Sequence, residues 1–295
     1  MSRPSTIDTI TLYQKDRVIS ADGTAKLSYW VKNNYQCDTC LLELPYRETP
    51  LVICVSTQVG CPFDCSFCAV GLTTFQRTLA EQELLDQILL SRLDPWWGSK
   101  VSEPYEVAAM GTGEPMLALP KLIGAIRRAK EQDPALVSLN VATVGIPDKI
   151  RKYANENIDH VKLGLQISVH GSKDEQRRYL MPRAADFDLG SIVEAGIYFA
   201  KTRNTKVVAN YLLIRGVNDS IEDAKRLAAL LDPNHFAVKV SALNAVTGGK
   251  WTPANTKSLL EFCDWLKSNG MNARVFTSAG VDIRAGCGQF SNLPL

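Results

Sequence analysis

The segment Cys61-Pro62-Phe63-Asp64-Cys65-Ser66-Phe67-Cys68 places three cysteines in a C-x3-C-x2-C spacing on one short stretch. It follows residues 51–56, an apolar run rich in β-branched side chains that predicts a buried strand. Four cysteines saturate a [4Fe–4S] cube, so three thiolates leave one iron open. An open coordination position is typical of a catalytic metal site. We therefore predict a catalytic iron–sulfur cluster here; the alternative is a zinc site with a distant fourth ligand.

Beyond this segment the chain alternates between strand-like and helix-like stretches. Expected strands cover residues 51–56, 107–110, 137–144, 161–169, 207–214 and 236–243. Expected helices cover residues 79–93, 121–131, 147–155, 191–201, 220–231 and 256–269. Six strand–helix units predict an α/β fold with parallel strands and right-handed crossovers. Six units are too few for a closed eight-stranded barrel, so we expect a partial (β/α)6 barrel with its site at the carboxyl ends of the strands.

The first fifty residues follow a different pattern. Residues 10–13 and 27–31 are typical of short strands, separated by the turn signal Asp22-Gly23. We therefore expect a small N-terminal β extension over residues 1–50. The barrel, with a C-terminal cysteine loop, would then cover residues 51–295.

The composition of the 295-residue chain is that of a globular protein, with 45% hydrophobic and 22% charged residues. No apolar run approaches the roughly 18 residues that span a bilayer, and the start shows no signal segment. We therefore expect a cytoplasmic protein with reduced cysteines and no membrane partner. The net charge of +2 gives no support for nucleic-acid binding by the chain as a whole.

The cysteine spacing, with an aromatic residue just before the last cysteine, resembles the signature of the radical S-adenosylmethionine (SAM) superfamily. Four further motifs narrow the resemblance. They are Gly111-Thr112-Gly113-Glu114-Pro115, Ile167-Ser168-Val169-His170, Gly216-Val217-Asn218-Asp219 and Asp282-Ile283-Arg284-Ala285-Gly286-Cys287-Gly288-Gln289. In this order they are similar to the RlmN/Cfr family of class A, cobalamin-independent radical SAM methyltransferases, over about residues 24 to 290.

The resemblance implies a [4Fe–4S] cluster held by Cys61, Cys65 and Cys68, with SAM bound at the open iron. It implies methylation of C2 or C8 of an adenosine in ribosomal or transfer RNA, with an external electron donor such as flavodoxin or ferredoxin. By the same resemblance, Cys287 carries a methyl group as S-methylcysteine. Cys54 resolves the covalent intermediate, so that two SAM molecules are consumed and a Cys54–Cys287 disulfide forms.

The resemblance also implies a set of SAM-contacting positions at strand ends. They are Phe67, Gly113, Glu114, Thr143, Ser168, His170 and Asn244. A polar residue at the end of a strand is also typical of turn and cap hydrogen bonds, which is the alternative for each.

The departures from the family lie on the substrate side. The helical accessory domain that precedes the strands in typical members is replaced by residues that predict β structure, and Cys40 falls about where the family has an acidic residue. An alternative function is therefore the same chemistry on a peptide, nucleotide or small metabolite; a further one is a non-catalytic iron–sulfur or zinc protein. If RNA is the acceptor, the candidate basic contacts are Arg77, Lys121, Arg127, Arg128, Lys130, Arg177 and Arg178.

Two remaining cysteines lie in Cys37-Asp38-Thr39-Cys40. With Cys263 they either form a second metal site or are incidental. The sequence does not assign a role to these three thiols.

Overall fold

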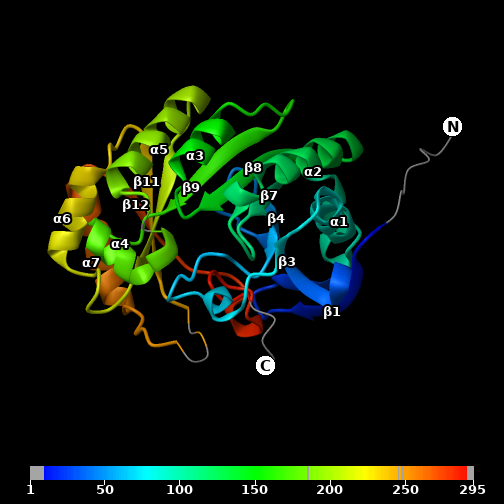
Figure 1. Cartoon of the computed structure of the whole chain (residues 1–295), viewed down its shortest axis with the longest axis horizontal. Coiled ribbons are helices and arrows are strands. Elements are labelled where there is room, and N and C mark those ends of the chain that lie inside the picture. Colours follow the sequence, from blue (N-terminus) through cyan, green and yellow to red (C-terminus); the bar gives the residue numbers. More distant parts are fainter. Residues whose placement is uncertain (1–9, 185, 245, 247–248, 291–295) are drawn as a thin grey trace.

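The computed structural model describes residues 10–290 apart from 185, 245 and 247–248, and within them ten strands form one curved sheet (Figure 1). Its strand order is β1-β2-β3-β4-β7-β8-β9-β10-β11-β12. The pairs from β4 to β12 are parallel. These strands are β4 (Leu51–Val55), β7 (Tyr105–Ala109), β8 (Leu136–Thr143), β9 (Lys162–Ser168), β10 (Val207–Leu213), β11 (Phe236–Ala242) and β12 (Asn272–Phe276). β4 and β7 are buried at every position, as expected for parallel strands covered on both faces.

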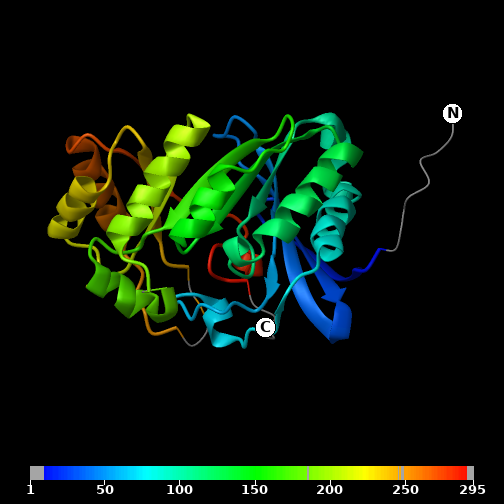
Figure 2. The same cartoon turned by 45° about the horizontal axis from the view of Figure 1, so that its top comes forward.

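Helices cover the outer face of the sheet, and the cysteine loop (residues 61–68) and the C-terminal segment lie on its inner side (Figures 1 and 2). The helices are α1 (Glu81–Arg92), α2 (Leu119–Gln132), α3 (Pro147–Ala154), α4 (Asp174–Leu180), α5 (Leu189–Arg203), α6 (Ile221–Leu230) and α7 (Thr256–Ser268). Local sequence sets their starts: Pro147 occupies the first turn of α3, and Ser220 caps α6 in a capping box with Asp223. The predicted (β/α)6 barrel is confirmed.

Two elements of the barrel were not predicted. β12 adds a seventh parallel strand beside β11, and the short helix α4 follows β9 ahead of α5. β12 has the sequence Asn-Ala-Arg-Val-Phe, in which only one residue is buried. Such a sequence lacks the continuous apolar run that marks a strand. α4 is a seven-residue helix with five polar or charged residues, too short to show a helical period.

The N-terminal residues form β structure, as predicted, and extend the same sheet. β1 (Tyr13–Ile19), β2 (Ala25–Val31) and β3 (Tyr35–Glu43) pair antiparallel, and β3 pairs antiparallel with β4. The prediction of a strand at residues 10–13 is wrong, because the Thr11 N–H and hydroxyl bind the Asp86 carboxylate (2.6 and 2.7 Å) instead of a neighbouring strand. The division into two domains at residue 50 stays a prediction.

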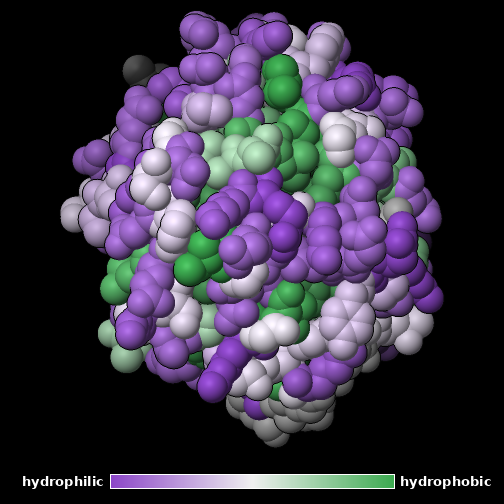
Figure 3. Space-filling view, turned by 90° about the vertical axis from the view of Figure 1, so that its left-hand side faces the viewer, coloured by the Kyte–Doolittle hydropathy of each residue, from purple (hydrophilic) through white to green (hydrophobic). Residues whose placement is uncertain are grey.

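Two apolar clusters lie on opposite faces of the sheet. The larger one packs between the sheet and the helices, and the smaller one comprises Cys40, Cys54, Val70, Ala285 and Phe290. Hydrophilic residues cover most of the side of the molecule that carries α6 and α7 (Figure 3). In the described part of the chain, no helix combines the length and apolar character needed to cross a membrane.

Candidate active site

The cysteine loop is fixed by contacts from segments far along the chain. The Ser66 N–H donates to the Leu180 carbonyl at the end of α4 (2.9 Å). The Trp251 indole donates to the Ser66 carbonyl (3.0 Å), and Arg183 donates to the Pro62 carbonyl (3.2 Å). The loop therefore has a defined shape that does not depend on its own short sequence alone.

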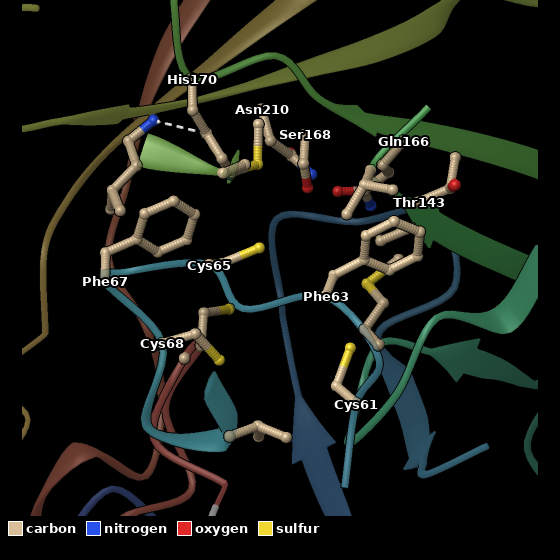
Figure 4. A pocket seen from close by; sticks show the side chains of 18 of the residues that line it. Cys61, Phe63, Cys65, Phe67, Cys68, Thr143, Gln166, Ser168, His170 and Asn210 are labelled. Atoms are coloured by element: carbon tan, nitrogen blue, oxygen red, sulfur yellow. Dashed lines mark hydrogen bonds between the residues drawn. The ribbon is translucent and has the colours of Figure 1, made fainter. Parts of the chain in front are cut away.

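A cavity of about 210 Å³ lies between this loop and the inner face of the sheet; we call it the first cavity. It brings together almost all of the predicted site residues. They are Cys61, Cys65, Phe67, Cys68, Gly113, Glu114, Thr143, Ser168, His170, Asn244 and Cys287. Figure 4 shows Thr143 and Ser168 across the space from the three cysteines of the loop. Of the predicted site residues only Cys54 lies elsewhere, and the roles of all of them stay predictions.

The three loop thiols suit a cluster as their partner. Burial raises the pKa of Cys61 to about 12, and it also raises the pKa values of Cys65 and Cys68. Other thiols of the loop raise the pKa values of Cys61 and Cys65 further, and Cys287 raises that of Cys68. Three adjacent thiolates are therefore unfavourable without positive charge between them. Iron supplies that charge, and thiolate sulfur is its usual ligand in clusters. The donor set therefore fits a [4Fe–4S] cluster.

Glu114 is a buried carboxylate at the carboxyl end of β7. Its side chain accepts hydrogen bonds from the N–H groups of Met116 (3.0 Å) and Val144 (2.9 Å). Burial raises the pKa of Glu114 to about 7, against the lowering effect of these bonds. The turn before it needs glycine at Gly113, where φ is +107° and an added Cβ would lie 2.6 Å from Gln58. A ligand ammonium in the first cavity would stabilise the ionised form of this carboxylate.

His170 faces the first cavity as a neutral ring. Its Nδ1 accepts the Leu212 N–H (3.0 Å), so in the neutral ring the proton lies on Nε2. Burial, with smaller contributions from Arg177 and Lys239, lowers the pKa of His170 to about 3. The Phe67 ring meets it edge-on, with centroids 5.0 Å apart. The pair therefore offers one aromatic face and one N–H donor to a ligand.

This histidine makes stability depend on pH in a defined direction. Between about pH 6.5 and 3 the unfolded chain binds a proton at His170 that the folded chain does not, so the free energy of unfolding falls as the pH falls. One proton corresponds to about 1.4 kcal/mol per pH unit. We expect His170→Asn, which keeps an acceptor for the Leu212 N–H, to flatten this dependence. Urea unfolding of cluster-free protein at pH 5.5 and 7.0 measures the free energy of unfolding at each pH. An equal change between the two pH values in the wild type and in His170→Asn would contradict the assignment of this pH dependence to His170.

Arg177 is a buried residue beside the site whose structural role the sequence did not identify. It is 1% exposed and donates to the carbonyls of Ser168 (2.6 Å), Val169 (3.2 Å) and Val144. These carbonyls lie at or directly after the carboxyl ends of β8 and β9. Its expected role as an RNA contact is therefore wrong, because the guanidinium is buried and clamps the strand ends beneath the first cavity.

The loop that carries Cys287 is held from both sides of the molecule. The Asn244 side chain donates to the Cys287 carbonyl (2.9 Å), and the Ala69 N–H donates to the Gly288 carbonyl (2.7 Å). From the β1–β2 turn, Asp22 accepts the Gly280 N–H (2.8 Å), and the Ser20 hydroxyl donates to Asp282. The N-terminal strands thus position the exposed Cys287 thiol.

A second cavity, of about 340 Å³, lies on the other side of this thiol. Cys54 and Cys40 line it, and Cys287 lines both cavities. Its wall also includes the exposed residues Tyr46, Thr205 and Lys206, so it reaches the surface. Cys287 therefore faces the predicted cluster on one side and Cys54 on the other.

Polar side chains on the inner face of the sheet line the second cavity. Glu106, 2% exposed, accepts hydrogen bonds at Oε2 from Arg47 (2.8 Å) and Asn140 (2.6 Å). Its Oε1 is buried with no hydrogen-bond partner among the described residues. Lys239 donates to Gln166 in the same wall (2.7 Å).

The remaining basic candidates are mostly engaged within the chain. Arg77 pairs with Glu83 (2.6 Å), Arg127 with Glu156 (3.0 Å) and Arg128 with Glu81 (3.4 Å), while Lys130 donates to the Pro134 and Leu136 carbonyls. Lys121 and Arg178 are exposed. Fewer of the candidate basic side chains are therefore available to contact RNA than the sequence suggested.

Cys37, Cys40 and Cys263 do not together form a second metal site. Cys37 and Cys40 are three residues apart on β3, so they point to opposite faces of the sheet. Cys37 and Cys263 belong to the outer core, whereas Cys40 belongs to the inner cluster with Cys54.

Comparisons with known proteins agree with the observed fold. A family model described as the radical SAM superfamily matches residues 55–231. A probable dual-specificity RNA methyltransferase RlmN of Thermotoga neapolitana is 35% identical over 287 residues, covering 96% of this chain and 80% of the relative. One of Dictyoglomus turgidum is 33% identical over 281 residues, covering 94% and 78%. The crystal structure of a radical SAM methyltransferase from Sphaerobacter thermophilus matches at TM-score 0.85 and 28% identity, covering 95% of this chain and 81% of that one.

Proposed function

Because the chain belongs to the radical SAM superfamily and to the RlmN family of methyltransferases within it, we propose that it methylates C2 or C8 of an adenosine in RNA. A [4Fe–4S] cluster and SAM are the cofactors of this family. Cys61, Cys65 and Cys68 would hold the cluster, which when bound supplies the electron that cleaves SAM. The other predicted residues of the first cavity would hold SAM, with Glu114 toward its ammonium.

The position of Cys287 between the two cavities is the observation that carries this proposal. An sp2 carbon of adenine is a poor nucleophile toward a methyl sulfonium, so a direct transfer fails. Cys287 instead loses its thiol proton and accepts a methyl group from one SAM on the side of the first cavity. The deoxyadenosyl radical from a second SAM would remove a hydrogen atom from that methyl group, and the methylene radical would add to an acceptor carbon in the second cavity. The adduct would return one electron to the cluster and lose the proton on that carbon. The Cys54 thiolate would then attack the Cys287 sulfur, and the methylated product would leave and take up a proton, so the two thiols end as a disulfide that a reductant must open.

The second cavity suits an adenine base as the acceptor. At about 340 Å³ it falls in the range of ligand pockets. Glu106 and Lys239 both line this cavity, where Glu106 would accept a hydrogen bond from the exocyclic amine and Lys239 would donate to a ring nitrogen. The base must leave its stack to reach Cys287, as in other enzymes that act on bases.

Aromatic and basic side chains beside the cysteine loop support an RNA acceptor. Tyr179 is 58% exposed and lies edge-on to Trp251 with ring centroids 5.2 Å apart. The Lys250 ammonium lies 4.6 Å from the Trp251 ring centroid. Unstacked RNA bases bind on such aromatic surfaces, with cations contacting the phosphates. We propose a cytoplasmic enzyme that uses an external one-electron donor such as flavodoxin or ferredoxin.

A non-RNA acceptor is the second candidate, favoured by the engaged basic side chains. Arg77, Arg127 and Arg128 form ion pairs and Arg177 is buried, which leaves few cations for phosphates. Filter binding of RNA across a salt series separates the candidates, since phosphate contacts give a steep salt dependence. A flat, weak binding curve favours the small acceptor.

The direct test is peptide mass spectrometry on protein purified anaerobically with its cluster. We expect one added methyl on the peptide that contains Cys287, and transfer of label from methyl-labelled SAM to RNA. A cluster-loaded, SAM-binding chain with unmodified Cys287 would refute the methylene-transfer mechanism. A methylated Cys287 without labelled RNA would refute only the RNA acceptor.

A further inference from the structure

We propose that Cys40 is a third redox thiol, which takes over the disulfide from Cys287 after each turnover. This inference rests on the proposed function, because that function supplies the Cys54–Cys287 disulfide. The exchange would return Cys287 to its thiol form while Cys40 and Cys54 hold the oxidation on the sheet.

The strand register supplies the geometry. Cys40 on β3 lies directly opposite Cys54 on β4 in an antiparallel pair. Directly opposite residues of such a pair share one face of the sheet, with Cα atoms about 4.5–5.5 Å apart. Disulfides usually join Cα atoms about 4.4–6.8 Å apart, so this pair can be bridged without moving the backbone.

The surroundings place Cys54 between two thiols. Cys40, Cys54 and Cys287 all line the second cavity. Burial is the largest cause of the raised pKa of Cys40, and Cys54 adds more to it than the more distant Cys287 does. Burial likewise raises the pKa of Cys54 to about 12, and there Cys287 is the largest charge contribution. Cys54 is therefore the common partner of both thiols.

A lysine lies in the same row of side chains as Cys40 and Cys54. Lys26 on β2 is the register partner of Cys40, so the row Lys26–Cys40–Cys54 crosses three neighbouring strands on one face. Lys26 lowers the pKa of Cys40, against the stronger effects of burial, Cys54 and Asp38, with which Lys26 forms an ion pair (3.4 Å). Its ammonium also donates to the Arg284 carbonyl (3.4 Å) in the loop that carries Cys287. A cation beside a thiol favours the thiolate that exchange requires.

The exchange balances without gain or loss of electrons. The Cys40 thiolate attacks the Cys54 sulfur, the Cys40–Cys54 bond forms, and the Cys54–Cys287 bond breaks. Cys287 leaves as a thiolate and takes up the proton that Cys40 gave up. A small dithiol entering the second cavity then reduces the Cys40–Cys54 disulfide and becomes a disulfide itself.

The test maps disulfides in enzyme purified without its cluster and then loaded with iron and sulfide in the absence of SAM, so that Cys287 carries no methyl group. This enzyme is equilibrated without oxygen in mixtures of oxidised and reduced glutathione, then acid-quenched and alkylated. We expect Cys40–Cys54 peptides in the wild type, in Cys287→Ala and in the control Cys37→Ala. Cys37 is a matched control because it is buried on the same strand but faces the outer core. Cys40→Ala should show only the Cys54–Cys287 pair.

A second readout follows the freed thiol. Oxidised enzyme is cleared of glutathione and given SAM without reductant. We expect about tenfold more methyl on Cys287 in the wild type and in Cys37→Ala than in Cys40→Ala, because only the relay releases Cys287. A Cys54–Cys287 disulfide with Cys40 alkylated at every glutathione ratio overturns the relay and leaves the proposed function intact. Absence of the Cys54–Cys287 disulfide even in Cys40→Ala overturns both.

Discussion

Replacing Cys54 with alanine is expected to leave the acceptor covalently attached to Cys287. Without a thiol opposite Cys287 in the second cavity, nothing attacks the Cys287 sulfur after the methylene carbon has bonded to the acceptor. Turnover should therefore stop after at most one acceptor per chain. Mass spectrometry of the Cys287 peptide would show the attached nucleotide after nuclease digestion, and the mass of that adduct would identify the acceptor.

The matched control for this variant is Cys263→Ala. Cys263 is as buried as Cys54 but lies on α7 in the outer core, away from both cavities. It should keep wild-type turnover, whereas a Cys54→Ala enzyme that releases methylated product over many cycles would contradict the resolving role.

Arg177→Met is expected to remove roughly 3–5 kcal/mol from the free energy of unfolding. The arginine donates to three carbonyls at the ends of β8 and β9, and each buried carbonyl left without a donor costs about 1–3 kcal/mol. A loss of this size is a large share of the stability of a typical domain. Because Val144, Ser168 and His170 border the first cavity, SAM binding should weaken as well.

Urea unfolding of cluster-free protein measures the stability, and equilibrium dialysis with SAM measures the binding. Arg178→Met is the control, because this neighbouring arginine is exposed and should change the midpoint little. Equal midpoints for the two variants would show that Arg177 is not the clamp inferred here.

The barrel could be predicted because most of its strands have an apolar pattern in their own sequence. Residues 51–55, for example, are apolar without interruption, and the observed bounds of β4 differ from the expected ones by one residue. β12 could not be predicted in this way, since its burial comes from pairing with β11 and packing of α7. No pattern within residues 272–276 indicates that they pair with β11 or pack against α7.

The candidate site shows the same limit. The spacing of Cys61, Cys65 and Cys68 is a local signal, and the first cavity does gather them with residues from six strand ends. The position of Cys40 opposite Cys54 depends on the register of β3 and β4, which is set by their pairing and not by either sequence alone. Arg177 looked like a surface charge beside Arg178, and only the packing of α4 against the sheet buries it.

The anchoring of the Cys287 loop to the β1–β2 turn has a consequence for synthesis. The contacts of Ser20 with Asp282 and of Asp22 with Gly280 join residues 262 and 258 positions apart. On the ribosome, the first strands must wait for nearly the whole chain to be made before these contacts can form. The barrel can therefore assemble before Cys287 is in place, so the residue proposed to accept the methyl group would be positioned in the last stage of folding.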